Sequence, residues 1–220
     1  MKPVTIIVPS YCPDETVRSY ETRCLVQLAQ HTPKELYDLI VMQGGDWSYP
    51  QKVNAAVTGV RTKYVAILSN DVFVGPNWLE YMIGDLEHLS KWHCAVLSPQ
   101  DQNYPAVGGS YGDYHWHEHW WALVLMKTSF YRLMDGLSEE LPRTYHDQDF
   151  SIRTYKQGYR ICRTKNVRVE HVGMATRSRV GGDDSAEKAW MEKRHAGSSE
   201  LRDWLQLQPS DFDYENLIPQ

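Results

Sequence analysis

Polar side chains follow four short apolar runs, at the points where the runs end. Ser10-Tyr11 follows the first run, residues 43–46 follow the second, Ser69-Asn70-Asp71 follows the third, and His171 ends the last. Open parallel sheets bind their ligands just beyond the carboxyl ends of the strands. If the runs are strands of one such sheet, these residues meet at one edge and form the predicted binding site.

This predicted site lacks a glycine-rich phosphate loop. Neither G-x-G-x-x-G nor G-x-x-x-x-G-K-[ST] occurs in the chain, which disfavours dinucleotide oxidoreductases and P-loop enzymes. Without such a loop, a diphosphate is best held by a divalent cation, and carboxylates are the ligands that such a hard cation prefers. Asp71 stands where it could supply one. Its position alone equally allows a plain turn, because Asn and Asp often form turns after strands.

The apolar runs alternate with stretches of helical periodicity. We expect strands at residues 4–9, 39–42, 64–68, 94–98, 120–126 and 167–172. We expect helices at residues 14–31, 52–60, 76–89, 129–133, 147–157 and 186–195, with a further helical stretch near Leu201. Strand and helix in alternation predict a parallel sheet with helices on its faces. Residues 99–119 show no clear period and are expected to form a long excursion with a functional role.

Length and composition are those of one globular domain. The chain has 220 residues, of which 42% are hydrophobic and 23% are charged. Its apolar runs fall far short of the roughly 20 residues that a membrane-spanning helix needs, and its first residues do not form a secretory signal, so we expect a cytoplasmic protein without a membrane span. Four cysteines without a C-x-x-C pair favour neither a zinc ribbon nor a disulfide framework. The net charge of −5 disfavours a broad electrostatic grip on nucleic acid.

The segment KVNAAVTGVRTKYVAILSNDVFVGPNWLEYMI resembles the central segment of family-2 glycosyltransferases of the GT-A fold. In that family an Asn-containing helix, a Gly and an apolar strand lead into a D-x-D-like triplet, which is followed by Pro-x-Trp-Leu. The corresponding residues here are Asn54, Gly59, Ser69-Asn70-Asp71 and Pro76-Asn77-Trp78-Leu79. Ser69 replaces the first acid of the triplet, so the resemblance supports only Asp71 as a metal-binding carboxylate.

A second segment, HDQDFSIRTYKQGYRICRTKNVRVEHVG, resembles the acidic helix start, the Gly-Tyr-Arg and the strand ending in His of the same family. His146 stands where the family often has Glu. The resemblance implies that Asp147 is the general base and that His171 binds the metal or contacts the diphosphate, while Asp149 orients its neighbours or the acceptor. Acids at a helix start also cap the helix and interact favourably with its dipole, so both aspartates have a structural interpretation as well. For His171 the alternative is a histidine that is simply hydrogen-bonded at a strand end.

The resemblance implies an α/β fold of the GT-A, Rossmann-like type. This is a three-layer sandwich with a mostly parallel central sheet and a C-terminal helical flap. Residues 1–220 would form a single GT-A domain. Within it, residues 1–98 would bind the nucleotide sugar, residues 99–175 would hold the acceptor and the catalytic residues, and residues 176–220 would form the flap.

The function that the resemblance implies is an inverting glycosyltransferase. It would move a sugar from a nucleoside-diphosphate sugar, with UDP-sugars favoured, to an acceptor hydroxyl with the help of Mn²⁺ or Mg²⁺. The expected donor contacts are Pro9, Tyr11, Gln43, Asn54, Asn70, Asp71 and Arg177, and the expected metal ligands are Asp71 and His171. Trp120 and Asp149 are expected on the acceptor side.

The histidine-rich run HWHEHWW at residues 115–121 has two interpretations. In an extended chain His115, His117 and His119 share one side, which suggests a metal site. No Cys or Asp at ligand spacing accompanies them, so we favour an aromatic wall of the acceptor site that includes Trp120.

The acceptor class stays open between a glycan, a protein and a modified nucleic-acid base, and the oligomeric state is also open. Two other functions fit the sequence as well. Ser69 and His146 stand at positions that are usually acidic, which allows a catalytically inactive module that binds sugar nucleotides or carbohydrates. A nucleotidyltransferase could share the sheet and the metal.

Overall fold

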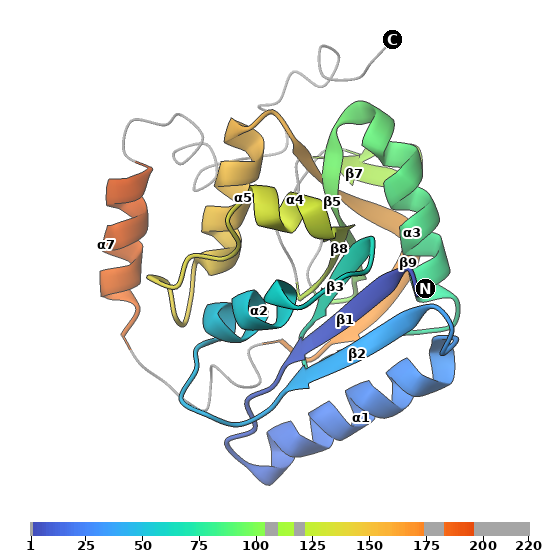
Figure 1. Cartoon of the computed structure of the whole chain (residues 1–220), viewed down its shortest axis with the longest axis horizontal. Coiled ribbons are helices and arrows are strands. Elements are labelled where there is room, and N and C mark those ends of the chain that lie inside the picture. Colours follow the sequence, from blue (N-terminus) through green and yellow to red (C-terminus); the bar gives the residue numbers. More distant parts are fainter. Residues whose placement is uncertain (1, 104–109, 117–121, 174–182, 196–220) are drawn as a thin grey trace.

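The computed structural model of the chain describes residues 2–103, 110–116, 122–173 and 183–195 (Figure 1). Nine strands form one sheet within these residues: β1 (Val4–Pro9), β2 (Tyr37–Met42), β3 (Tyr64–Leu68), β4 (Val72–Phe73), β5 (Cys94–Asp101), β6 (Ser110–Tyr111), β7 (Tyr114–Trp116), β8 (Leu123–Lys127) and β9 (Arg160–His171). The helices of the same residues are α1 (Glu15–His31), α2 (Tyr49–Thr58), α3 (Trp78–Leu89), α4 (Thr128–Leu133), α5 (His146–Lys156) and α7 (Ser185–Arg194), with a 3₁₀ turn at Ser90–Trp92. None of these described helices is long and apolar enough to cross a membrane.

The sheet is mixed, so the prediction of a mostly parallel sheet is wrong. Its strand order is β2-β1-β3-β8-β5-β9-β7-β6, with β4 paired to β9. β1 is parallel to β2 and β3, and β5 is parallel to β9. β8 lies between β3 and β5 and runs antiparallel to both, and β4, β6 and β7 add further antiparallel pairs. The described part of the chain between β5 and β8 contains the β6–β7 hairpin rather than a crossover helix, and a parallel pair requires such a crossover.

Two apolar cores, one on each face of the sheet, make the fold three-layered. Along β1, the side chains of Val4, Ile6 and Val8 belong to one core, while Ile7 belongs to the other. Successive strand side chains point to opposite faces, so a continuous apolar strand fits a sheet that is covered on both sides. α1 and α3 supply the first core, and α2, α4 and α5 supply the second (Figure 1). The predicted three-layer α/β sandwich is therefore confirmed.

β9 is the strand that departs most from its predicted bounds. It begins at Arg160, well before the predicted range 167–172. Its first half contains Thr164, which is fully buried and donates a hydrogen bond to the Asp85 carboxylate of α3 at 2.5 Å. Asn166 donates to the same carboxylate at 3.1 Å. Thr164 and Asn166 thus find their partner on a distant helix, which no local hydrophobic pattern indicates.

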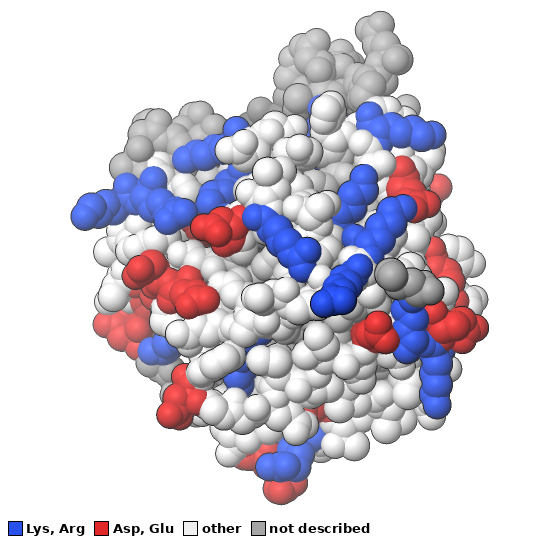
Figure 2. Space-filling model, in the orientation of Figure 1, with Lys and Arg blue, Asp and Glu red and all other residues white. Residues whose placement is uncertain are grey.

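The predicted C-terminal flap is described in part. α7 stands beside α5 at the left of Figure 1, where Met191 packs with Leu141 and Ile152 in a small apolar cluster. Residues 174–182 and 196–220, including the helical stretch predicted near Leu201, lie outside the described residues. On the face drawn in Figure 2, acidic and basic side chains are interspersed, so this face is neither wholly basic nor wholly acidic.

Candidate active site

The carboxyl ends of β1, β2 and β3 lie side by side at one edge of the sheet. Pro9, the last residue of β1, is paired with Met42, the last residue of β2. The Ser10 N–H donates to the Met42 carbonyl at 3.1 Å, and β3 pairs with the other side of β1 in the same direction. Ser10, Gln43 and Ser69 therefore leave the sheet at a common edge.

The Asp71 carboxylate faces His171 across a short antiparallel strand pair. Val72 of β4 is paired with His171 of β9, and the N–H of Val172 donates to the Asp71 carbonyl at 3.1 Å. The Nε2 atom of His171 lies 3.4 Å from Asp71 Oδ1, and its Nδ1 atom lies 2.9 Å from Asp101 Oδ2. Burial lowers the pKa of His171, but the hydrogen bonds with Asp101 and Asp71 outweigh burial and raise the pKa to about 9.

The Asp71 and His171 side chains are the described pair of predicted ligands that could hold a divalent cation. A histidine ligand commonly donates its second ring nitrogen to a carboxylate, and Asp101 is placed to receive Nδ1–H of His171. Neighbouring ligands of an octahedral cation with bonds of about 2.1 Å stand about 3 Å apart; here Nε2 and Oδ1 are separated by 3.4 Å. The described residues contain no group of three His, Cys, Asp or Glu side chains that could hold a metal. The protein's two ligands would therefore be completed by water and substrate phosphates, as is usual for Mg²⁺.

Tyr49 links the Asp71 side of the site to the start of α5. Its ring stacks on His146, and its hydroxyl interacts with Ser69. Burial raises the pKa of the Tyr49 hydroxyl, the interaction with Ser69 lowers it, and the carboxylates of Asp147 and Asp71 raise it further. The Tyr49 hydroxyl is thus affected by both carboxylates of the predicted site.

Asp147 lies in the first turn of α5 and is half-buried. Its Oδ1 atom accepts the N–H of Gln148 at 2.9 Å. The first N–H groups of a helix lack intrahelical partners and form its positive end, so an acid is favourable there. The capping interpretation therefore holds for one oxygen of Asp147. The side chain is still partly open to solvent, as a proton acceptor for a bound substrate must be.

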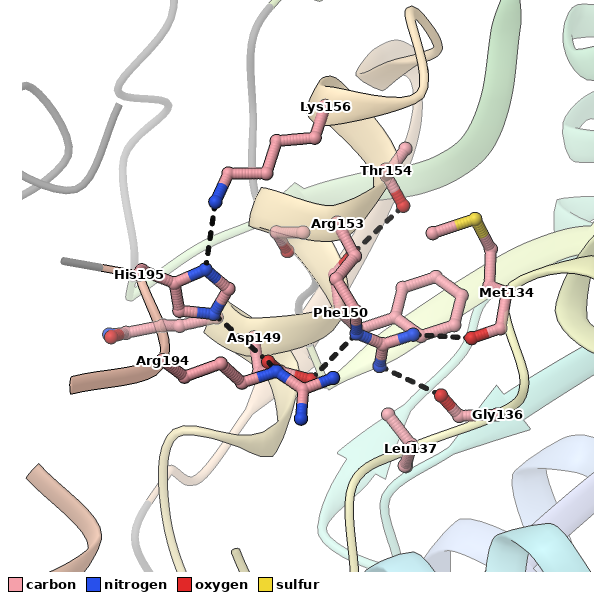
Figure 3. A network of polar contacts seen from close by, with 12 residues as sticks. Met134, Gly136, Leu137, Asp149, Phe150, Arg153, Thr154, Lys156, Arg194 and His195 are labelled. Atoms are coloured by element: carbon pink, nitrogen blue, oxygen red, sulfur yellow. Dashed lines mark hydrogen bonds and ion pairs between the residues drawn. The ribbon is translucent and has the colours of Figure 1, made fainter. Parts of the chain in front are cut away.

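Asp149 is two residues further on and is fully buried. Its Oδ2 atom lies 2.8 Å from Arg153 Nε, and its Oδ1 atom lies 3.0 Å from His195 Nε2 and 3.1 Å from Arg194 Nε (Figure 3). These contacts support the predicted role of Asp149 in orienting its neighbours. A direct contact with the acceptor would require α7 to move, because the Arg194 and His195 side chains occupy the carboxylate from that side.

Two buried side chains of opposite charge, Glu21 and Lys52, lie next to the predicted donor contacts Tyr11 and Gln43. Tyr11 is 49% exposed, and Gln43 is exposed and donates Nε2–H to Glu21 Oε1 at 3.1 Å. The buried Lys52 ammonium donates to the Ser10 carbonyl at 2.5 Å and lies 5.8 Å from the centre of the Tyr11 ring. Burial lowers the pKa of Lys52. Glu21 and Lys52 thus contact the two exposed residues that are predicted to bind the donor.

Asp101, Glu21 and Lys52 are site residues that the sequence analysis did not identify. Asp101 falls in the stretch without periodicity, although it is the last residue of β5. A signal existed for Glu21, because it occupies the buried stripe of α1 at helical spacing between Val17 and Cys24. A buried acid on an apolar stripe needs a partner, and such positions are often functional.

Two other predicted donor contacts differ in their surroundings. Asn70 is buried beside Asp71, and its Nδ2 atom lies 3.9 Å from Cys12 Sγ. Asn54 instead fastens the segment between α4 and α5: its Nδ2 atom donates to the Leu137 carbonyl at 2.9 Å, and its Oδ1 atom accepts from the Tyr131 hydroxyl at 2.6 Å. A donor contact by Asn54 would have to be made in addition to these bonds.

Asn54 also lines a cavity of about 730 Å³ between α2, α4, α5 and α7. Its other lining residues include Arg132, Arg153 and Arg194, but none of the other predicted site residues in the described part of the chain. The cavity is therefore separate from the Asp71 edge. We place the candidate active site at that edge, because the strand ends lie there and Asp71 follows the end of β3.

Several predicted residues lie outside the described residues. They are Trp120 and Arg177, together with His117 and His119 of the histidine-rich run. The backbone of His115 lies in β7, paired with Arg163 of β9.

Solved structures that share this fold include glycosyltransferases. GalNAc-T7, solved with UDP, GalNAc and Mn²⁺, matches with a TM-score of 0.61 and 10% identity, over 77% of this chain and 44% of that chain. S. aureus TarS 1-349 matches with a TM-score of 0.56 and 14% identity, over 96% and 77% of the two chains. The catalytic domain of Drosophila β1,4-galactosyltransferase 7, in complex with xylobiose, matches with a TM-score of 0.59 and 14% identity, over 90% and 82%.

These similarities are of structure. No protein-family model and no curated protein matches the chain. The chain spans less than half the length of the GalNAc-T7 chain and most of the other two. At such low identities the similarity shows the fold alone, which is the GT-A fold that the sequence resemblance predicted.

Proposed function

We propose that the chain is an inverting glycosyltransferase that moves a sugar from a nucleoside-diphosphate sugar, first of all a UDP-sugar, to an acceptor hydroxyl. The observation that carries this proposal is that α2 connects the strand ends to the start of α5: Lys52 donates to the Ser10 carbonyl after β1, and Tyr49 stacks on His146, the residue before Asp147. In this proposal Asp71 binds the metal and Asp147 accepts the proton at the carboxyl ends of the strands. The glycosyltransferases that share the fold support the same reaction class.

On the donor side, Asp71 and His171 hold Mn²⁺ or Mg²⁺ in this proposal. The cation, when bound, neutralises charge on the diphosphate leaving group. Asp101 keeps the His171 ring in place through Nδ1. The GalNAc-T7 structure contains UDP and Mn²⁺, which supports this donor class and this cation. The other proposed donor contacts are Pro9, Tyr11, Gln43, Asn54, Asn70 and Arg177.

On the acceptor side, Asp147 is the general base. The acceptor oxygen attacks the anomeric carbon while the bond from that carbon to the diphosphate oxygen breaks. The hydroxyl proton passes to an Asp147 carboxylate oxygen, and the nucleoside diphosphate leaves with the bonding electrons. One displacement of this kind inverts the anomeric centre. A positioned base typically contributes about 10²–10⁴-fold to the rate.

The rest of the chain is assigned by the same proposal. Residues 1–98 form the donor half, residues 99–175 the acceptor and catalytic half, and residues 176–220 the flap. Trp120 lines the acceptor site, and Asp149 orients the acceptor side through its neighbours. A glycan, a protein and a modified nucleic-acid base are all compatible acceptors.

The test is release of UDP from a panel of UDP-sugars with Mn²⁺ across an acceptor screen. We expect Asp147→Asn to lower turnover by about 100-fold or more and to leave the binding of UDP with Mn²⁺ unchanged. We expect Asp71→Asn to lose the Mn²⁺-dependent part of UDP binding. Asp38→Asn is the matched control, because Asp38 is exposed and pairs only with Lys2 among the described ion pairs.

Two results would contradict the proposal in different ways. Wild-type turnover by Asp147→Asn would remove the assignment of the base. Binding of UDP-sugars by the wild-type chain without turnover of any donor would instead identify an inactive sugar-nucleotide binding module, which Ser69 and His146 at usually acidic positions favour.

A further inference from the structure

We infer that Glu187 of α7 is a positioning residue for Asp147, because it holds the backbone from which α5 begins. The inference rests on the proposed function of Asp147 and extends it. It gives the C-terminal helix a part in the reaction other than that of a closing flap.

Glu187 lies in the first turn of α7, and its carboxylate contacts the segment that precedes α5. Its Oε2 atom accepts the N–H of Thr144 at 2.7 Å, the Thr144 hydroxyl at 3.2 Å and the N–H of Arg143 at 3.3 Å. Glu187 is only 8% exposed, and Thr144 is also buried. Buried backbone N–H groups outside helices and strands need a partner, and bonds to a carboxylate are stronger than bonds between neutral groups.

The start of α5 depends on such outside support. Its N-cap residue is Tyr145, which makes no side-chain capping hydrogen bond and has a φ of 62°. Residues other than glycine adopt this left-handed conformation only where the surrounding structure imposes it. Glu187 binds Thr144, which directly precedes Tyr145, and Asp147 lies two residues after Tyr145. The Glu187 carboxylate therefore constrains the turn that aims Asp147.

α7 also holds α5 on the other side of Asp147. Arg194 Nε and His195 Nε2 lie 3.1 Å and 3.0 Å from Asp149 Oδ1, and Figure 3 shows both side chains converging on this carboxylate. Met191 packs in an apolar cluster with residues of α5 and of the segment before it. Asp147 thus lies on a turn that α7 fixes at Thr144 before it and at Asp149 after it.

The expected effect of losing Glu187 is on the chemical step. Without the carboxylate the Asp147 turn samples more positions, and a misplacement of about 1 Å can lower a rate by about 100-fold. We expect Glu187→Ala to lower kcat by about tenfold or more. KM for the donor and the affinity for UDP with Mn²⁺ should stay within about twofold, because Asp71 and His171 do not touch α7 in the described contacts. Glu187→Gln keeps an acceptor oxygen and should recover most of kcat.

The experiment compares the full chain with Glu187→Ala, Glu187→Gln and Glu192→Ala, an exposed glutamate of the same helix. Hydrogen–deuterium exchange is measured over residues 141–150, together with UDP release from a UDP-sugar and UDP binding with Mn²⁺, all normalised to the folded fraction. We expect faster exchange and a lower kcat in Glu187→Ala, recovery of both in Glu187→Gln, and no change in Glu192→Ala. If Glu187→Ala is unfolded, Glu187→Asp replaces it, since the shorter side chain withdraws the carboxylate and should give the same pattern.

Two outcomes would overturn the inference. One is exchange over residues 141–150 that is the same in Glu187→Ala and Glu192→Ala. The other is a Glu187→Ala turnover per folded molecule equal to that of the wild type. A wild-type chain that turns over no donor while the exchange difference persists would overturn the proposed function, and the catalytic part of this inference with it.

Discussion

The imidazole of His146 stacks on the ring of Tyr49, with ring centroids 4.8 Å apart and ring planes inclined by 20°. Tyr49 begins α2 and His146 begins α5, so the stack joins two helix starts that are far apart in the chain. The Tyr49 hydroxyl also interacts with Ser69. Ser69 and His146 stand at positions that are acidic in the pattern that the chain resembles, and one tyrosine interacts with both.

Tyr49→Phe removes the hydroxyl but keeps the ring that stacks on His146, so it tests the hydroxyl alone. Removing the hydroxyl, and with it the interaction with Ser69, should lower the free energy of unfolding by about 1 kcal/mol, the usual contribution of one hydrogen bond. Tyr49→Ala removes the stack as well and should lower it by about 3 kcal/mol. Urea denaturation measures both, with Tyr81→Phe on the exposed face of α3 as the control. Equal losses in Tyr49→Phe and Tyr49→Ala would show that the stack with His146 contributes nothing.

Metal binding should depend on His171 and Asp101 to different degrees. His171→Ala removes a proposed ligand and should abolish the Mn²⁺-dependent rise in melting temperature in the presence of UDP. Asp101→Asn removes only the partner of Nδ1 and should weaken Mn²⁺ binding by about 10–100-fold. Mn²⁺ titrations followed by thermal shift measure both effects. An unchanged Mn²⁺ response in His171→Ala would exclude this histidine as a ligand.

The stability of the chain should fall as the pH falls below neutral. Burial lowers the pKa of His195, and Asp149 offsets this only in part. In the unfolded chain the His195 imidazole has its ordinary pKa of about 6.5 and binds a proton below that pH, whereas the native imidazole has a lower pKa and stays neutral. The stability that is present above about pH 6.5 is therefore lost as the pH falls below that value and through the native pKa. Burial also lowers the pKa of His146, which adds a change of the same sign.

His195→Gln tests this pH dependence. Urea denaturation between pH 5 and pH 8 should show a shallower decrease of the unfolding free energy in His195→Gln than in the wild type, because one of the two histidines with a lowered pKa is removed. Parallel profiles for the two proteins would show that His195 does not cause the loss.

Two glycine substitutions should change stability in opposite directions. Gly136 has a φ of +67°, and a Cβ atom there would lie 2.5 Å from Asn54 Oδ1. Gly136→Ala should therefore lower the free energy of unfolding by about 2 kcal/mol or more, through strain and disruption of the Asn54 bonds. Gly84→Ala meets no atom within 4 Å on α3 and should raise it by about 0.5–1 kcal/mol. A Gly136→Ala variant that is more stable than the wild type would show that the hydrogen bonds of Asn54 do not stabilise the segment between α4 and α5.

The sequence alone was sufficient for those parts of the fold and site that depend on neighbouring residues. β1 and β3 have their predicted bounds, because runs of apolar residues with β-branched members are a local signal for strands buried on both faces. α5 begins within one residue of its predicted start, and its acids mark that start because they interact favourably with the first turn. Asp71 and Asp147 were named from motifs whose spacing is local in the same way.

The tertiary structure alone decided what depends on segments distant in the chain. Asp147 and Asp149 are two residues apart on one helix, yet one is partly open and the other is buried, because Arg194 and His195 arrive from α7. The antiparallel direction of β8 and the contact of Asp101 with His171 are also set by partners far away in sequence. Such contacts depend on how the layers pack, and hydrophobic periodicity records which side of an element is buried but not which distant residue will cover it.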